Sequence, residues 1–266
     1  MDQLTVIVPC KDEAENIERT IESIDRVLPE LDVQVHILMV DDGSTDGTSD
    51  VMEKICEQRS DCEMLVQEIN RGLGRTVLNA YHHIPEDHWV AVFPGDNELV
   101  FDSIKKFLAM RDEHDLILGY LQNPVIRTVV RRVASTLFST VVRFVYGYPY
   151  QYLNGMKLYR VRVFKDIDVI STGHAFNAEL LAKAILREPS LQIGEAPFIA
   201  RGRATGATKA FRPGSVLIAL RDVFWGYKSV CDYREKAILE QADGPMEKPR
   251  PIQRNFEDIA AGDREA

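Results

Sequence analysis

The sequence predicts an α/β protein in which a mainly parallel sheet is flanked by helices. Short apolar runs rich in β-branched residues alternate with segments of helical spacing, which is the pattern of β-α-β units. Two of these runs end in acidic clusters, Asp41-Asp42 and Gly95-Asp96-Asn97-Glu98. Ligands of open α/β sheets bind outside the carboxyl ends of the strands. The two clusters therefore mark a candidate site.

Up to residue 121, predicted strands and helices alternate regularly. Leu4–Val8 is an apolar run closed by Pro9, and in Asp12–Leu28 isoleucines recur at helical spacing. The same two patterns then repeat, giving strands at Val33–Val40, Leu65–Gln67, Trp89–Phe93 and Leu116–Leu121 and helices at Thr48–Arg59, Thr76–His83 and Phe101–Asp112.

After residue 121 the pattern changes. Pro124–Tyr146 is long, apolar and basic, which predicts a single helix. The remaining predicted elements are an edge strand at Asn154–Tyr159, a helix at Phe176–Leu186, a last strand at Leu191–Ala200 and an amphipathic helix at Val216–Tyr233. We expect one domain over residues 1–240, with halves 1–120 and 121–240, and a flexible polar tail over 241–266.

Charge is divided unevenly between the two halves. Residues 1–120 hold 10 basic and 26 acidic side chains, whereas residues 121–236 hold 18 basic and 8 acidic ones. The basic half predicts an anionic partner, such as nucleotide phosphates, a lipid phosphate or a membrane surface. Nucleic acid is not expected, because the basic residues carry no recognition motif and no stacking platform of aromatics.

Compartment is predicted from three simpler observations. No run approaches the roughly 20 apolar residues of a membrane-spanning helix. The start of the chain, Met1 to Leu4, has no basic segment, so we expect no signal peptide. The four cysteines have no metal-ligand spacing and predict reduced thiols. We therefore expect a cytoplasmic protein, peripheral at the inner face of the membrane if it meets lipid.

The acidic strand ends predict metal-assisted binding of a nucleotide. Asp96 and Glu98 are alternate residues, so their oxygens can point to one side, as a hard cation requires. Mg²⁺ or Mn²⁺ held there would bridge a diphosphate. A polar turn after a strand is the alternative. Glu13 either complements a helix dipole or lines the same crevice, and Arg71 lies in a glycine-containing loop that is either a phosphate loop or a plain turn.

Taken in order, these motifs resemble a known family. Val8-Pro9 with Glu13, Val40-Asp41-Asp42-Gly43-Ser44, Asn70-Arg71-Gly72-Leu73-Gly74 and Gly95-Asp96-Asn97-Glu98 are similar to the nucleotide-sugar-binding half of family 2 glycosyltransferases, which have the GT-A fold. Residues 203–209 and 154–159 resemble segments of the dolichol-phosphate mannose synthase branch. The resemblance covers about residues 4–225.

The resemblance implies a role for each matched position. The nucleotide would be bound by Pro9, Lys11, Glu13, Asp41, Asp42 and Arg71. The metal would be held by Asp96, in the place of the second aspartate of an Asp-x-Asp motif, and by Glu98. The acceptor and its phosphate would be bound by Arg127, Arg131, Ser135, Arg203 and Lys209.

The chain departs from the family pattern at two positions. Pro94 stands where the first aspartate of Asp-x-Asp is expected, and Leu121 replaces an arginine usual in the lipid-phosphate branch. Arg127, Arg131 and Ser135 would share one stripe of a helix that is either buried or interfacial. For a hydroxyl acceptor, Glu179 is the candidate general base, with His174 behind it.

Three functions follow, in order of preference. The first is a metal-dependent, inverting transferase that moves a sugar from a UDP- or GDP-sugar to a polyprenyl phosphate at the membrane surface. The second is a soluble transferase with a hydroxyl acceptor, favoured by the missing membrane helices. The third is a catalytically silent nucleotide-sugar-binding protein, favoured by Pro94 and Leu121. A dehydrogenase ranks below these, because no GxGxxG follows the first strand.

Overall fold

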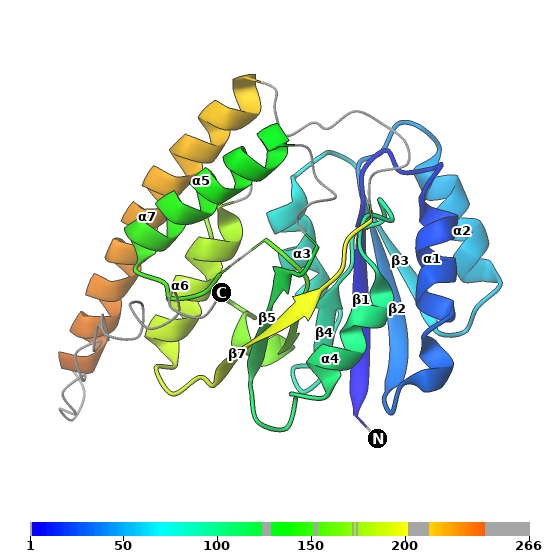
Figure 1. The fold of residues 1–266 in the computed structure, drawn as a ribbon, viewed down its shortest axis with the longest axis horizontal. Coiled ribbons are helices and arrows are strands. Elements are labelled where there is room, and N and C mark those ends of the chain that lie inside the picture. Colours follow the sequence, from blue (N-terminus) through cyan, green and yellow to red (C-terminus); the bar gives the residue numbers. More distant parts are fainter. Residues whose placement is uncertain are drawn as a thin grey trace.

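The computed structural model describes residues 2–123, 129–151, 154–171, 173, 175–201 and 213–242. Its core is a seven-stranded sheet in the order β3-β2-β1-β4-β6-β5-β7 (Figure 1). The strands are β1 (Gln3–Cys10), β2 (Gln34–Asp42), β3 (Cys62–Gln67), β4 (Trp89–Val92), β5 (Leu116–Leu121), β6 (Lys157–Arg160) and β7 (Ile193–Phe198).

Helices cover both faces of this sheet. The α-helices are α1 (Ile17–Asp25), α2 (Thr48–Glu57), α3 (Leu73–Tyr81), α4 (Ile104–Leu108), α5 (Val129–Tyr146), α6 (Phe176–Arg187) and α7 (Pro213–Ala242), and the 3₁₀ helices are η1 (Leu28–Glu30), η2 (Phe101–Ser103) and η4 (Val161–Val163). Side chains alternate across β1, so Val6 and Val8 join the core under α1, α2 and α4, whereas Ile7 joins the core under α3 and α6. The α/β prediction is confirmed.

The position predicted from the sequence for the antiparallel strand β6 is wrong. Asn154–Tyr159 predicted an edge strand, but β6 lies inside the sheet, antiparallel to both β4 and β5. The edges are β3 and β7. An interior strand is packed on both faces, and Leu158 and Tyr159 are accordingly buried in opposite cores. All the other strands run in one direction, so their carboxyl ends and the start of β6 share one edge of the sheet.

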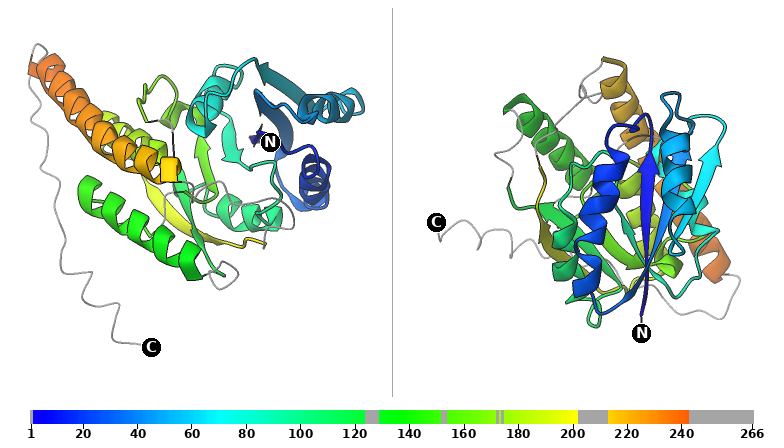
Figure 2. Two further views of the ribbon diagram at one scale, coloured as in Figure 1. Left: turned by 90° about the horizontal axis from the view of Figure 1, so that it is seen from above. Right: turned by 90° about the vertical axis from the view of Figure 1, so that its right-hand side faces the viewer.

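The second half of the chain adds three long helices on one side. Helix α7 lies along α6, with α5 beside it (Figure 2). Helix α7 extends beyond the predicted Val216–Tyr233 at both ends. Residues 124–128 of the predicted helix Pro124–Tyr146 and residues 243–266 of the predicted tail lie outside the described residues. In the described ranges, we find no helix with the length and apolarity needed to cross a membrane.

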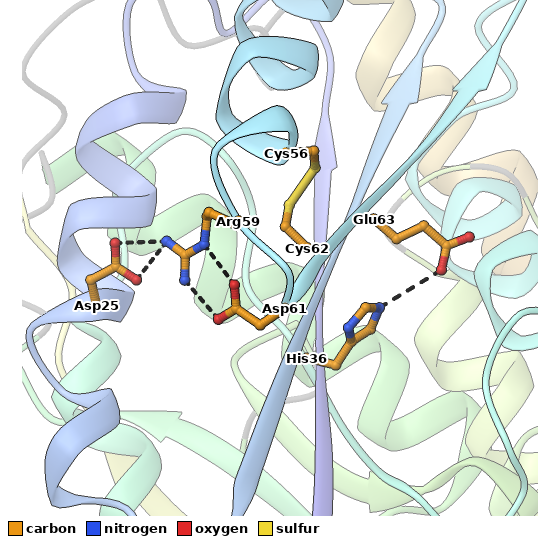
Figure 3. The surroundings of a disulfide bond; sticks show 7 residues. All are labelled: Asp25, His36, Cys56, Arg59, Asp61, Cys62 and Glu63. Carbon is orange, nitrogen blue, oxygen red and sulfur yellow. Dashed lines mark hydrogen bonds and ion pairs between the residues drawn. A yellow bond between two sulfur atoms is a disulfide. The ribbon is translucent and has the colours of Figure 1, made fainter.

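The expectation that all cysteines are reduced is wrong for one pair. Cys56 at the end of α2 and Cys62 at the start of β3 form a disulfide, with Cα atoms 5.1 Å apart (Figure 3). The turn between the two elements brings their Cα atoms into the usual disulfide range. Arg59 in this turn pairs with Asp25 at 2.7 Å and with Asp61 at 2.9 Å. Cys10 and Cys231 are free thiols.

Candidate active site

The loops that follow β1 and β2 form the first part of the site and are bound to each other. Because the strands are parallel neighbours, Cys10 lies opposite Asp41. Asp12 has a left-handed backbone, with φ 53°, and its carboxylate accepts hydrogen bonds from Lys11 Nζ and Thr45 N, both at 2.9 Å. Lys11 also donates to the carbonyl of Gly43 at 3.0 Å. The Lys11 ammonium, predicted to bind nucleotide, is therefore fixed over the loop after β2.

Glu13 and Pro9 lie at the same strand end. The backbone N–H of Glu13 donates to Thr48 Oγ1 at 2.9 Å, and its carboxylate accepts from Asn16 Nδ2 at 2.7 Å. Pro9 is buried at the end of β1, where its carbonyl accepts from Gly95 N at 3.1 Å. Pro9 and Glu13, which were predicted to bind the nucleotide, thus hold the loop after β1 against the loops that follow β2 and β4.

The paired aspartates of β2 are buried and organise the neighbouring turns. Asp41 is 1% exposed, and its carboxylate accepts hydrogen bonds from Ser44 N at 2.9 Å and from the Ser49 hydroxyl. Asp42 accepts from the backbone N–H groups of Arg71 at 2.7 Å and Gly72 at 3.0 Å. The Asp42 carboxylate therefore fixes the loop before α3, which leaves the Arg71 side chain exposed at the edge of the site.

The loop after β4 carries the predicted metal ligands. Asp96 Oδ1 accepts a hydrogen bond from Glu98 N at 3.0 Å, around Asn97 with φ 53°. The loop is held against β1, because a Cβ added to Gly95 would lie 2.6 Å from Cys10 Sγ. Arg201, after β7, donates from its backbone to the Glu98 carbonyl at 2.6 Å.

Arg201 was not predicted from the sequence, which pointed to Arg203 as the phosphate-binding arginine. Its guanidinium donates to Asn97 Oδ1 at 3.2 Å, so a cation lies against the loop that carries Asp96. The only feature of the sequence that could have indicated Arg201 was its position directly after the last predicted strand. Pairing of Leu99 with Ala200 brings the two segments together, and local spacing does not reveal such a long-range contact.

Negative charge gathers where these loops meet. Burial raises the pKa of the Cys10 thiol, and the carboxylates of Asp41, Glu13 and Asp96 raise it further. Carboxylates from three strand ends therefore act on a single buried sulfur. A set of this kind needs a cation or hydrogen-bond donors to offset its mutual repulsion.

A divalent cation fits this donor set when a substrate completes its coordination. Among the described residues, no group of three His, Cys, Asp or Glu side chains is arranged to hold a metal alone. Mg²⁺ is commonly bound through one or two carboxylates together with substrate phosphates and water. Asp96 and Glu98, both partly exposed on one short loop, match that arrangement.

The predicted acceptor residues are only partly described. Arg127, Arg203 and Lys209 lie outside the described residues, as does His174. Arg131 lies in α5, although its side chain is outside the description, and Ser135 is a partly exposed residue of the same helix. Their roles stay predictions.

Glu179, the candidate general base, is fully buried at the start of α6. Its carboxylate accepts from Lys183 Nζ at 2.8 Å, Ser171 Oγ at 2.6 Å and Ile170 N at 3.1 Å. Burial alone would raise the pKa of Glu179, but the hydrogen bonds from Lys183 and Ser171 outweigh it and lower the pKa. An enclosed carboxylate of low pKa is a poor proton acceptor near neutral pH, so this geometry favours a structural role.

Sequence comparison places these features in a family. The model of glycosyl transferase family 2 matches residues 5–183. The dolichol-phosphate mannosyltransferase of Saccharomyces cerevisiae is 26% identical over 225 residues, covering 81% of this chain and 83% of that protein. The polyprenol monophosphomannose synthase of Mycolicibacterium smegmatis is 28% identical over 216 residues, covering 77% of this chain and 79% of that protein.

Structure comparison agrees at the level of the fold. Glucosyl-3-phosphoglycerate synthase from Mycobacterium tuberculosis, solved with Mg²⁺ and UDP, superposes with a TM-score of 0.62 at 17% identity, covering 87% of this chain and 80% of that one. Because the family model matches most of the chain and the sheet has the expected architecture, the chain belongs to glycosyl transferase family 2 and is a glycosyltransferase with the GT-A fold.

Proposed function

We propose that this glycosyltransferase moves a sugar from a UDP- or GDP-sugar to the phosphate of a polyprenyl phosphate, with Mg²⁺ or Mn²⁺ as cofactor. An acceptor phosphate oxygen would form a bond to the anomeric carbon as the bond to the diphosphate breaks. The nucleoside diphosphate would leave with the electron pair, and the anomeric centre would be inverted. When bound, the cation would neutralise charge on this leaving group.

The acidic edge around Cys10 supports the donor half of this proposal. Asp41, Glu13 and Asp96 come from the ends of three strands and lie near one another, where a metal–diphosphate complex would offset their charge. Asp96 and Glu98 would hold the cation. Lys11 and Arg71 would approach the nucleotide from the loops after β1 and β3.

The surroundings of Glu179 support a phosphate acceptor. A hydroxyl acceptor needs a base, whereas a phosphate monoester is already an anion and needs none. The candidate base on α6 is buried in an ion pair with Lys183. This favours the phosphate acceptor over the hydroxyl acceptor. The yeast and mycobacterial relatives, by their names, transfer mannose to dolichol phosphate and make polyprenol monophosphomannose.

Helix α5 supports action at a membrane surface. Its exposed side chains include Val133, Leu137 and Phe144, which are 62%, 64% and 88% exposed. Arg132 and Arg143 lie on the same helix. Apolar side chains flanked by arginines suit the boundary between lipid headgroups and acyl chains. The predicted acceptor residues Arg131 and Ser135 lie on this helix too.

Calorimetric titration of UDP and GDP, with Mn²⁺ and then with chelator, tests the donor site. We expect one nucleotide to bind only with metal, and Asp96→Ala to abolish this binding while the protein stays folded. Asp50→Ala, which removes an exposed carboxylate of α2, is the matched control. Unchanged metal-dependent affinity in Asp96→Ala would remove Asp96 from the site. No binding of either nucleotide to the unaltered protein would overturn the donor assignment, whereas binding without turnover of the sugar nucleotide would favour a silent protein.

Turnover with a short polyprenyl phosphate tests the acceptor. Arg131→Ala should raise the KM for the lipid phosphate more than it weakens donor binding. Equal losses in both would count against the acceptor role of Arg131. Transfer to a soluble hydroxyl acceptor, without any added lipid phosphate, would overturn the lipid assignment.

A further inference from the structure

Lys157, the first residue of β6, lies at the site edge of the sheet. Because β6 is antiparallel, its start lies beside the carboxyl ends of β4 and β5, and Lys157 is paired with Leu118. Side chains alternate along the strand, so Lys157 shares a face with Tyr159, whose core is covered by α3 and α6.

The Lys157 ammonium has no counter-charge among the residues that the structure describes. In the described ranges of the chain, no carboxylate lies within ion-pair distance of Nζ, which donates only to the Gly155 carbonyl at 3.3 Å. Desolvation lowers the pKa of this half-buried lysine to about 7. Lysines withdrawn from water are usually paired. Lys183 follows that rule with Glu179 at 2.8 Å, and so does Lys165 with Glu86 at 3.1 Å.

The segment before Lys157 is tightly packed. A Cβ on Gly155 would lie 2.5 Å from Phe198 Cε1 and 2.6 Å from the Gly119 carbonyl oxygen, so β5 and β7 enclose it. Asn154 accepts a hydrogen bond from Asn177 of α6 at 2.8 Å. Lys157 is therefore anchored from two sides, as a residue that positions a ligand needs to be.

The carboxylates elsewhere at this edge of the sheet mean that phosphate binding here requires a cation. The carboxylates around Cys10 would repel phosphate groups, and an ammonium removed from water attracts them more strongly than one in bulk solvent. Lysine also binds phosphate as a compact point charge. We propose that Lys157 binds a phosphate oxygen of a substrate next to the reacting carbon, a role that rests on the proposed glycosyl transfer.

Two groups could supply this oxygen, namely the diphosphate of the donor and the phosphate of the acceptor. Lys157→Met and Lys157→Gln remove the charge, and Lys157→Arg retains it. Lys165→Met is the matched control, because Lys165 follows the opposite end of β6. Each variant is titrated with UDP and GDP in the presence of Mn²⁺ and assayed with a short polyprenyl phosphate. Thermal unfolding confirms that each variant is folded.

A donor contact predicts that both neutral variants weaken nucleoside diphosphate binding by about tenfold or more. An acceptor contact predicts instead a similar rise in the KM for polyprenyl phosphate with nucleotide affinity unchanged. In either case Lys157→Arg should recover part of the loss, and Lys165→Met should change neither quantity.

The proposal is overturned if both neutral variants keep nucleotide affinity and acceptor KM within about twofold of the unaltered protein, a difference well below that of one charged hydrogen bond. A higher melting temperature in those variants would then identify Lys157 as merely a desolvated core lysine. Failure of the proposed function is separately visible, because the unaltered protein would then neither bind nucleotide nor transfer sugar.

Discussion

The carboxylate of Asp42 can be tested as the group that holds the loop before α3. It is 5% exposed and accepts two backbone hydrogen bonds, from Arg71 N at 2.7 Å and from Gly72 N at 3.0 Å. A hydrogen bond to a charged group contributes about 1.5–3 kcal/mol to stability. Gly72 is only partly buried, so water can replace some of the loss and the lower figure applies. Asp42→Ala should therefore lower the free energy of unfolding by about 3 kcal/mol.

Asp42→Asn separates the two bonds. An amide keeps one acceptor oxygen and presents an N–H₂ group to the second donor, so we expect about half of the loss seen with alanine. Urea unfolding followed by circular dichroism measures both variants, with Asp50→Asn on the exposed face of α2 as control. The reasoning is refuted if Asp42→Ala changes the unfolding free energy no more than Asp50→Asn does. It is also refuted if the asparagine variant is as unstable as the alanine variant.

Three further predictions concern loop packing, pH and the disulfide. Gly95→Ala places a Cβ 2.6 Å from Cys10 Sγ, so it should cost about 1–3 kcal/mol of stability and weaken metal-dependent nucleotide binding. Calorimetry should show that nucleotide affinity partly recovers when Cys10 is also changed to alanine. The hydrogen bond from Arg59 lowers the pKa of Asp61, so the stabilisation from this ion pair is complete above the unfolded pKa of about 4 and is lost as pH falls through the lower folded pKa. The unfolding free energy of Asp61→Asn, measured in urea, should therefore differ from that of the unaltered protein at pH 6 and converge with it in acid. A difference that stays constant with pH would contradict this. Cys56→Ser should lower the free energy of unfolding by about 2 kcal/mol, as expected for a disulfide that closes a short loop. A reductant should lower the stability of the unaltered protein to the same value. Stability that does not change with reductant would mean that the two thiols are not joined.

The first half of the fold could be predicted well because its signals are local. β1, β2 and β4 are short apolar runs, and β1 pairs in parallel with β2, the next strand of the chain. The position of β6 could not be predicted in the same way. Its neighbours β4 and β5 precede it by a long connection, and nothing in Asn154–Tyr159 encodes which strands it lies between. Burial on both faces was the only clue, and a four-residue strand shows it weakly.

The candidate site divides along the same line. The acids at the ends of β1, β2 and β4 were predicted to share an edge, and the structure brings Asp41, Glu13 and Asp96 together around Cys10. Their ligands stay predictions. Glu179 was predicted to be an accessible general base, but its partner Ser171 comes from a preceding loop and α7 covers it from much later in the chain. Contacts between distant segments, rather than local pattern, decide which carboxylates are accessible.

The insertion of β6 between β4 and β5 has a consequence for how the chain folds. During synthesis, β1 to β4 can assemble into a four-stranded sheet from contiguous sequence. Strand β5 emerges next, yet neither of its hydrogen-bonded neighbours, β6 and β7, has then been made. We expect β1 to β4 to gain protection from hydrogen exchange before β5 does, because the long connection from β5 to β6 must close first. The acceptor half would thus be the later-forming unit, assembled on a sheet that is already in place.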